Sequence, residues 1–250
     1  MARFVYLTTA VFLLQCILAV GYSEQVTTGT GGLVLSEDGV TTPVRLSPEE
    51  RAMAFLEKLE VKYREVTTIQ GEFQQLKKNV YFREEIKSQG VFYFKKPGKF
   101  RCDYLPPNES IYILANDTAW LYVPEIKQVD KVYMGQRTSR VERLNHMLLG
   151  FGVSVQDVRE VYAVETVDSG DEKNSVAIKF TLLKPNPDVN FESITIWFDN
   201  ESLAAKKVYI DEIGEDETII DLKEIKVNTN ISEALFRPFF PKDVEIIEHY

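Results

Sequence analysis

The stretch Gly90–Tyr104 reads GVFYFKKPGKFRCDY, and its first half carries an apolar or aromatic side chain at nearly every position. Successive side chains of an extended strand point to opposite faces, so Val91 and Tyr93 lie on one face and Phe92 and Phe94 on the other. A strand with one face on a core and the other in water alternates apolar with polar residues. Both faces of this strand are therefore expected to be covered.

Short runs of strand-forming residues fill most of the chain around this stretch, and turn residues such as those at 96–98 and 106–108 separate them. Helices do not alternate with these runs, so the pattern predicts an α+β fold with one antiparallel sheet of about eleven strands. A sheet of that size tends to curve and to have a concave side. The predicted strands are Ile69–Leu76, Ile86–Lys95, Lys99–Tyr104, Ser110–Ala115, Ala119–Val123, Gln128–Tyr133, Val161–Val167, Ser175–Leu183, Phe191–Phe198, Ala204–Ile210 and Thr218–Val227.

Two amphipathic helices are predicted to form a lid over the concave, apolar side of this sheet. The first begins at Ser47, where Ser-Pro-Glu-Glu provides an N-cap, a proline at the first helical position and the glutamate of a capping box. The second covers Ser139–Leu149, and Val155–Val161 adds a further helical turn or two. The apolar residues at helical spacing are Ala52, Phe55, Leu56, Leu59, Tyr63 and Val66 in the first helix, and Val141, Leu144, Met147 and Leu148 in the second. We expect these helices to roof the second apolar face of Gly90–Phe94.

The N-terminus has the pattern of a secretory signal peptide, because Arg3 is followed by a long apolar run and then by small residues. We predict a signal peptide over residues 1–22, and a retained membrane anchor is the alternative. The Thr- and Gly-rich residues 23–46 are predicted to form a flexible arm. Residues 47–250 are predicted to form the folded domain.

The net charge and the cysteine content bear on which partners and which covalent bonds the chain can form. The formal net charge is −9, so the chain lacks the excess of Lys and Arg that neutralises phosphates, and no nucleic-acid partner is expected. Cys16 follows Gln15, where a lipid-attachment signal has a small residue, so we treat Cys16 as an apolar leader residue; its lipidation is the alternative. Cys102 is then alone and has no partner for an intramolecular disulfide.

Residues for catalysis or metal binding are sparse. The two histidines, His146 and His249, do not form a two-histidine metal motif, and no nucleophile elbow, P-loop or dinucleotide fingerprint occurs. The acidic run over residues 211–217 lacks the regular ligand spacing of a calcium loop. We therefore expect no metal, no cofactor and no catalytic residue. An enzyme with two converging carboxylates is the alternative.

Aromatic residues are frequent in the predicted strands, where they form either a large core or the lining of a ligand cavity. Composition does not distinguish these two possibilities. The residues are Phe73, Phe92, Phe94, Phe100, Tyr104, Tyr112, Trp120, Tyr122, Trp197 and Phe198.

Several segments together resemble the LolA family of periplasmic outer-membrane lipoprotein carriers. They read VTTIQGEFQQ, GVFYFKKPGKFRCDY, PPNESIYILANDTAWLYVPEIKQV, RLNHMLLGFG and FRPFFPKDVEIIE, and with the first helix they span most of residues 48–248. The resemblance implies an incomplete, curved β-barrel lidded by helices, which binds the acyl chains of lipoproteins and is not an enzyme. It also implies a periplasmic location, an inner-membrane lipoprotein-releasing transporter as donor and an outer-membrane acceptor. A monomer is expected.

On this resemblance, a hydrophobic cavity for acyl chains is predicted to be lined by strand and helix residues: Phe73, Phe92, Phe94, Phe100, Trp120, Tyr122, Leu144, Met147 and Leu148. Lys96 stands where some family members have Arg, and it is predicted to latch a carbonyl of the lid by one charge-assisted hydrogen bond. Cys102 stands where the family commonly has Trp. A membrane-anchored lipoprotein acceptor or a lipoprotein-sensing regulator of the same fold is the alternative function.

Overall fold

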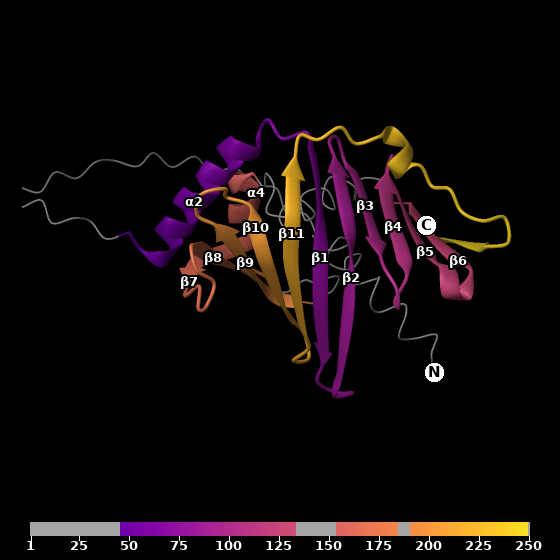
Figure 1. Cartoon of the computed structure of the whole chain (residues 1–250). Helices are drawn as coiled ribbons and strands as arrows, with labels where there is room; N and C mark the ends of the chain where they lie inside the picture. Colours follow the sequence, from indigo (N-terminus) through magenta and orange to yellow (C-terminus); the bar gives the residue numbers. More distant parts are fainter. Residues whose placement is uncertain (1–45, 134–153, 185–190, 250) are drawn as a thin grey trace, which may run out of the picture.

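The computed structural model describes residues 46–133, 154–184 and 191–249, and in it one sheet of 12 strands dominates the fold (Figure 1). The strands are β1 (Thr68–Asn79), β2 (Glu84–Lys95), β3 (Lys99–Tyr104), β4 (Ser110–Ala115), β5 (Thr118–Val123), β6 (Gln128–Tyr133), β7 (Tyr162–Val167), β8 (Ser175–Leu182), β9 (Phe191–Asp199), β10 (Ala205–Glu212), β11 (Glu217–Val227) and β12 (Glu245–His249). Their order is β12-β6-β5-β4-β3-β2-β1-β11-β10-β9-β8-β7. The edge strands β12 and β7 do not pair with each other, so the sheet is curved and open.

The predicted antiparallel sheet is confirmed, with one strand more than expected. Each predicted strand overlaps a strand of the structure. The additional strand β12 pairs in parallel with β6, and Ile246 lies opposite Val129. Its sequence EIIEH is short and does not alternate apolar with polar residues, so neither periodicity nor composition marked it as a strand.

Helix α2 (Pro48–Tyr63) begins with the predicted capping box. Ser47 Oγ accepts a hydrogen bond from the Glu50 N–H at 3.1 Å, and Glu50 Oε2 accepts one from the Ser47 N–H at 2.7 Å. The shorter helix α4 (Val155–Val161) lies against α2 and β7. No helix among the described residues is long and apolar enough to cross a membrane. The predicted helix at 139–149 lies outside the described residues, as do the predicted signal peptide and most of the predicted arm.

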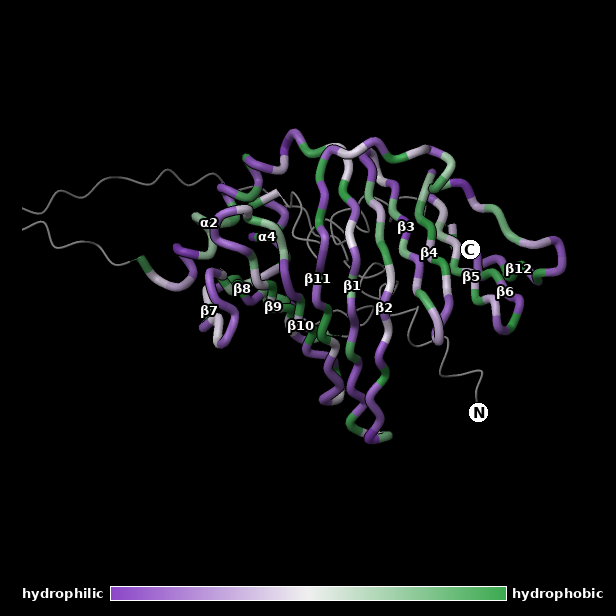
Figure 2. Tube along the Cα trace, in the orientation of Figure 1, coloured by the Kyte–Doolittle hydropathy of each residue, from purple (hydrophilic) through white to green (hydrophobic). Residues whose placement is uncertain are grey.

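The sheet has an inner face, which we define by Phe73, Phe92, Phe94 and Phe100. The buried residues of α2 belong to the same core as these phenylalanines, and α2 lies over the β7 end of the inner face (Figure 1). Figure 2 shows hydrophobic and hydrophilic residues alternating along the strands, as expected where the two faces differ in their surroundings. The buried residues of α2 are Ala52, Met53, Leu56, Leu59 and Tyr63.

The outer face is partly covered by residues 228–249, which we call the C-terminal strap. The strap follows β11, forms the 3-10 turn η3 (Glu233–Phe236) and ends as β12 (Figure 1). Its residues Ile231 and Phe236 are buried in a small cluster, against which Tyr93 and Trp120 pack. The two apolar faces of Gly90–Phe94 therefore have different surroundings, because the phenylalanines belong to the inner core and Tyr93 packs against the strap cluster. The predicted helix at 139–149 lies outside the described residues, so the expectation that both helices roof an apolar face of this strand stays a prediction.

Candidate functional site

The inner face is built from rows of residues that lie directly opposite one another on neighbouring strands. Opposed residues of an antiparallel pair share a face, so each row adds to one continuous surface. Two of these rows are Ile69, Phe94, Phe100 and Leu114, and Gly71, Phe92, Cys102 and Tyr112. The side chains in both rows are buried, so they form a broad apolar surface that is continuous with the core of α2.

Four of the predicted cavity residues come together on this surface. Phe73, Phe92, Phe94 and Phe100 are each at most 4% exposed. Phe73 lies over Gly90, where an added Cβ would come within 2.6 Å of the Phe73 ring and 2.2 Å of the Asp103 carbonyl oxygen. Any other residue at position 90 would therefore displace the ring or the neighbouring strand. The four rings belong to one apolar core, and their role in ligand binding stays a prediction.

Trp120 and Tyr122 are not on this surface, so the prediction that they line one cavity with the four phenylalanines is wrong. They alternate along β5 with Ala119 and Leu121, whose cross-strand partners belong to the inner face. Trp120 packs against the strap cluster, and the ring of Tyr122 lies 5.4 Å from that of Phe240 in the strap. Because β5 is apolar on both faces, its sequence did not indicate which side chains point inward. The predicted cavity residues Leu144, Met147 and Leu148 lie outside the described residues.

Lys96 lies at the end of α2. Its Nζ donates hydrogen bonds to the carbonyl oxygens of Tyr63 at 3.2 Å and Arg64 at 3.3 Å. These carbonyls are at the C-terminus of α2, where the helix dipole also favours a positive charge. Lys96 therefore holds one of the helices that cover the inner face, and its role as a latch stays a prediction.

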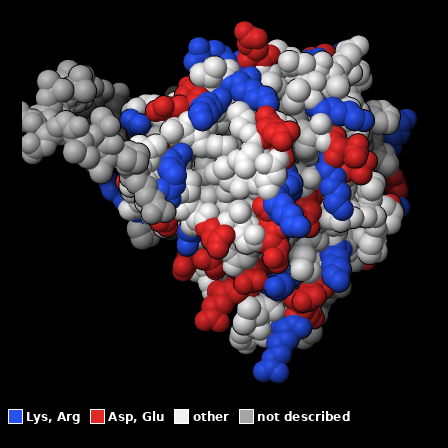
Figure 3. All heavy atoms as spheres, turned by 60° about the vertical axis from the view of Figure 1, so that its left-hand side comes forward, with Lys and Arg blue, Asp and Glu red and all other residues white. Residues whose placement is uncertain are grey.

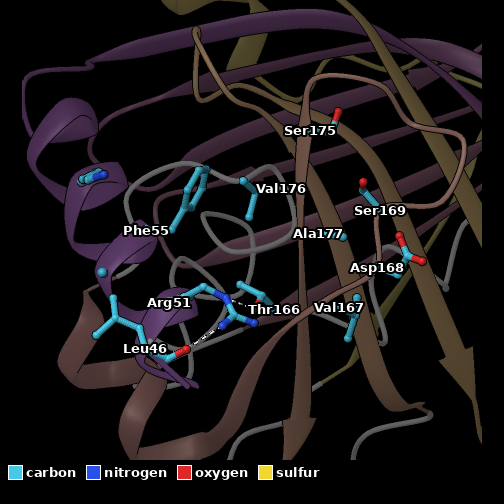
Figure 4. Close-up of a pocket in the computed structure, with 12 residues that line it drawn as sticks. Leu46, Arg51, Phe55, Thr166, Val167, Asp168, Ser169, Ser175, Val176 and Ala177 are labelled. Carbon is cyan, nitrogen blue, oxygen red and sulfur yellow. Dashed lines mark hydrogen bonds between the residues drawn. The ribbon is translucent and has the colours of Figure 1, made fainter. Parts of the chain in front are cut away.

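A pocket of about 590 Å³ opens between α2 and strands β7 and β8 (Figure 4). Its lining residues are Leu46, Arg51, Ala54, Phe55, Lys58, Thr166, Val167, Asp168, Ser169, Ser175, Val176 and Ala177. Arg51 joins the two walls, because its Nε donates to Thr166 Oγ1 at 3.2 Å and its Nη1 to the Leu46 carbonyl at 2.6 Å. Phe55 lines the pocket and lies 5.3 Å from the ring of Phe198, which is part of the inner core. The pocket is thus an opening beside the covered inner face.

Sequence reasoning missed this pocket. Phe55 was the only one of its lining residues that the helical period marked as apolar. The basic side chains around the pocket come from α2, and the hydroxyl groups come from residues at or next to the ends of β7 and β8. These strands are far from α2 in the sequence, so only the folded chain brings the groups together.

The apolar surface ends in a buried polar cluster near the turn between β1 and β2. Lys77 Nζ lies 3.2 Å from Glu212 Oε2, and Thr218 Oγ1 donates to Glu212 Oε1 at 2.5 Å. Burial raises the pKa of Glu212, while the bond from Thr218 and the charge of Lys77 oppose that rise. A buried ion pair is costly to break, so this cluster marks a fixed boundary of the apolar surface.

Within the apolar surface, Tyr112 carries a buried hydroxyl group for which the described part of the chain provides no hydrogen-bond partner. Its neighbour Cys102 is a buried free thiol, and burial raises its pKa well above the ordinary value, so it stays protonated. In residues 46–133, 154–184 and 191–249, no three His, Cys, Asp or Glu side chains are grouped to hold a metal ion. The buried phenylalanines and aliphatic side chains of the inner face offer an environment for apolar groups.

Fold and site together define an α+β protein in which an open, curved sheet holds an apolar inner face beneath a helix. The model of the family "Outer membrane lipoprotein carrier protein LolA" matches residues 64–238, and the chain belongs to this family. The chain is 28% identical over 208 residues to the outer-membrane lipoprotein carrier protein of Chromohalobacter salexigens, covering 83% of this chain and 90% of that protein. It is 25% identical over 210 residues to the protein of the same name from Methylococcus capsulatus, covering 84% and 92%.

A solved structure supports the fold assignment. The crystal structure of an uncharacterized conserved protein from Thermus thermophilus superimposes with a TM-score of 0.52 at 13% sequence identity. The match covers 80% of this chain and 99% of that one. At this identity the likeness concerns the fold alone.

Proposed function

We propose that the protein binds the acyl chains of lipoproteins on its inner face and carries them through the periplasm from the inner to the outer membrane. The observation that carries this proposal is the apolar inner face of the curved sheet, in a chain that belongs to a family described as lipoprotein carriers. The family description and the sparse catalytic chemistry both favour a carrier over an enzyme.

The energetic need for such a surface is large. Burial of one CH₂ group contributes about 0.8 kcal/mol, so a single long acyl chain exposed to water would cost on the order of 10 kcal/mol. The inner face offers phenylalanine rings and aliphatic side chains in place of water. A protein without a comparable apolar surface could not keep such cargo soluble.

Cargo would reach the inner face if α2 moved away from the sheet. The described polar contacts of α2 with the sheet side lie near its ends: Arg51 bonds Thr166, Lys62 bonds the Ser202 carbonyl, and Lys96 bonds the helix C-terminus. Between these polar contacts, α2 is held by apolar side chains. An acyl chain would make apolar contacts of the same type in their place. The pocket beside Phe55 is the place where a chain would enter first.

The predicted signal peptide over residues 1–22 supports a periplasmic location for the mature, monomeric protein. An inner-membrane lipoprotein-releasing transporter would deliver the cargo, and an outer-membrane acceptor would receive it. An intact mass that starts after the leader would agree with a soluble carrier. A lipid adduct on Cys16 or a retained leader would instead identify an anchored acceptor or regulator.

The test is binding of a fluorescent palmitoylated peptide to the purified mature protein. We expect saturable binding of the acylated peptide and no binding of the same peptide without its acyl chain. Native mass spectrometry of protein taken from its own compartment should show bound lipoprotein. Absence of acyl-dependent binding would overturn the proposal.

A further inference from the structure

The turn between β1 and β2 exposes large apolar side chains that the carrier function does not use. Tyr81 is 87% exposed, Phe82 is 67% exposed and Val80 is 48% exposed. Turn residues are normally polar or glycine, so an exposed Val-Tyr-Phe sequence is unusual. We call residues 80–82 the aromatic tip. Figure 1 shows that this hairpin extends beyond the other described strands, and Figure 2 shows its hydrophobic end.

The aromatic tip has a defined conformation. The Tyr81 and Phe82 rings lie 5.0 Å apart in an edge-to-face arrangement. Asn79 Oδ1 accepts a hydrogen bond from the Phe82 N–H at 2.8 Å, and Asp216 Oδ1 accepts one from the Val80 N–H at 2.9 Å. Asp216 belongs to the turn between β10 and β11, where Ile213 is also 54% exposed. The two neighbouring turns therefore present a small, preformed apolar projection.

We propose that the aromatic tip docks the protein on a lipid surface by inserting Tyr81 and Phe82 among zwitterionic headgroups. The rings project outward from a narrow turn, a shape suited to entering a soft headgroup layer. Tyrosine and other amphipathic aromatic residues favour the membrane–water interface, where a ring lies in an apolar layer and a hydroxyl stays hydrated.

Charge around the aromatic tip selects the kind of lipid. Glu84, Glu85 and Glu215 are exposed beside it and outnumber the exposed Arg83 of the same turn. Figure 3 shows Asp and Glu side chains toward the lower end of the molecule, together with Lys and Arg side chains that include its lowest projection. An anionic membrane surface would repel these carboxylates. Phosphatidylcholine and phosphatidylethanolamine present ammonium groups outermost, which complement them. This docking goes beyond the proposed carriage of acyl chains and does not depend on the inner face.

Flotation of the mature protein with vesicles tests the proposal. We expect binding to phosphatidylcholine vesicles, weaker binding when about a third of the lipid is phosphatidylglycerol, and recovery of that loss in high salt. Replacing both Tyr81→Ser and Phe82→Ser should lower the partition coefficient about ten-fold or more, because most of the projecting aromatic area is removed. The matched control is Phe239→Ser, since Phe239 is 92% exposed on the strap and should not affect binding.

The outcomes separate this docking from cargo binding. Affinity for the palmitoylated peptide, measured in the same samples without vesicles, should be equal in wild type and in the tip variant. Failure of the wild type to bind phosphatidylcholine, or equal binding by the tip variant, would overturn lipid docking. A tip variant that loses only delivery to an acceptor protein, with no wild-type vesicle binding, would show that the tip docks on protein instead.

Discussion

The inner and outer faces of the strand Gly90–Phe94 are both apolar, but their coverings are attached in different ways. On the outer face, Lys95 and Lys99 both pair with Glu233 of the strap at 2.9 and 2.5 Å, and Arg101 Nη1 donates to the Leu235 carbonyl at 2.9 Å. Beyond these contacts, β12 joins the strap to β6 by a backbone ladder. On the inner face, α2 is held by apolar packing and by a few long polar side chains near its ends.

The strap is therefore attached as a structural cover, whereas α2 is attached as a cover that a ligand can displace. A lipid chain has no hydrogen-bonding groups along its length, so it cannot replace a backbone ladder or an ion pair. It can replace apolar contacts such as the one between Phe55 of α2 and Phe198 of the inner core. An apolar strand face therefore indicates that a cover exists, while the way the cover is attached indicates whether a ligand can displace it.

The largest expected effect comes from removing one ring from each face. Phe236→Ala on the strap and Phe100→Ala on the inner face should each lower the free energy of unfolding by about 3–5 kcal/mol, because each leaves a cavity at a fully buried site. Only Phe100→Ala should change the affinity for an acylated peptide. Chemical denaturation and peptide titration measure the two quantities. Equal affinity changes in both variants would remove the distinction between the two covers.

A smaller effect is expected from the end of α2. Lys96→Met removes the donor to the Tyr63 and Arg64 carbonyls, and should speed dissociation of bound acyl peptide several-fold, in line with the loss of about 1 kcal/mol of hydrogen bonding. Lys96→Arg should restore the slow rate. Stopped-flow exchange of the bound acyl peptide measures this dissociation rate. An unchanged dissociation rate in Lys96→Met would show that the end of α2 does not limit cargo exchange.

Acid should weaken the attachment of the strap to the sheet. Hydrogen bonds from Lys99 and Lys95 lower the pKa of Glu233 from its usual 4.5 to about 2. Because the folded pKa is the lower one, the stabilisation is fully present above pH 4.5 and is lost as the pH falls toward 2. Glu233→Gln should therefore have a lower unfolding midpoint than wild type at neutral pH, and the two midpoints should converge in acid. Parallel curves at all pH values would contradict this assignment.

The smallest effect is expected at the unpaired hydroxyl of the inner face. Tyr112→Phe removes a buried group that has no described partner, so the free energy of unfolding should change by less than about 1 kcal/mol or rise slightly. The matched control is Tyr104→Phe, because Tyr104 donates to Gln75 Oε1 at 2.8 Å and its loss leaves a buried amide unpaired. That variant should lose about 1–3 kcal/mol. Equal losses in both would mean that Tyr112 has a partner in the folded protein.

The sequence allowed much of the fold to be predicted, since strand alternation, turn residues and the capping box at Ser47 are local signals. Trp120 and Tyr122 were placed on the wrong face because β5 is apolar on both sides, and the alternation that fixes orientation is absent there. The strap was missed because its contacts with Tyr93 and Trp120 join segments far apart in the chain. The pocket at Arg51 and Thr166 depends on the same kind of long-range contact, which local patterns do not encode.

The parallel pairing of β12 with β6 also sets an order of events during folding. The two strands are separated by about 110 residues, so their contact forms late and carries a high loop-closure cost. Until then, β6 is an open edge with unpaired backbone groups beside an uncovered Trp120. Before that pairing, any sheet formed by β1 to β6 has an exposed edge at β6. Aggregation during folding should therefore compete with closure of the strap rather than with formation of the inner core.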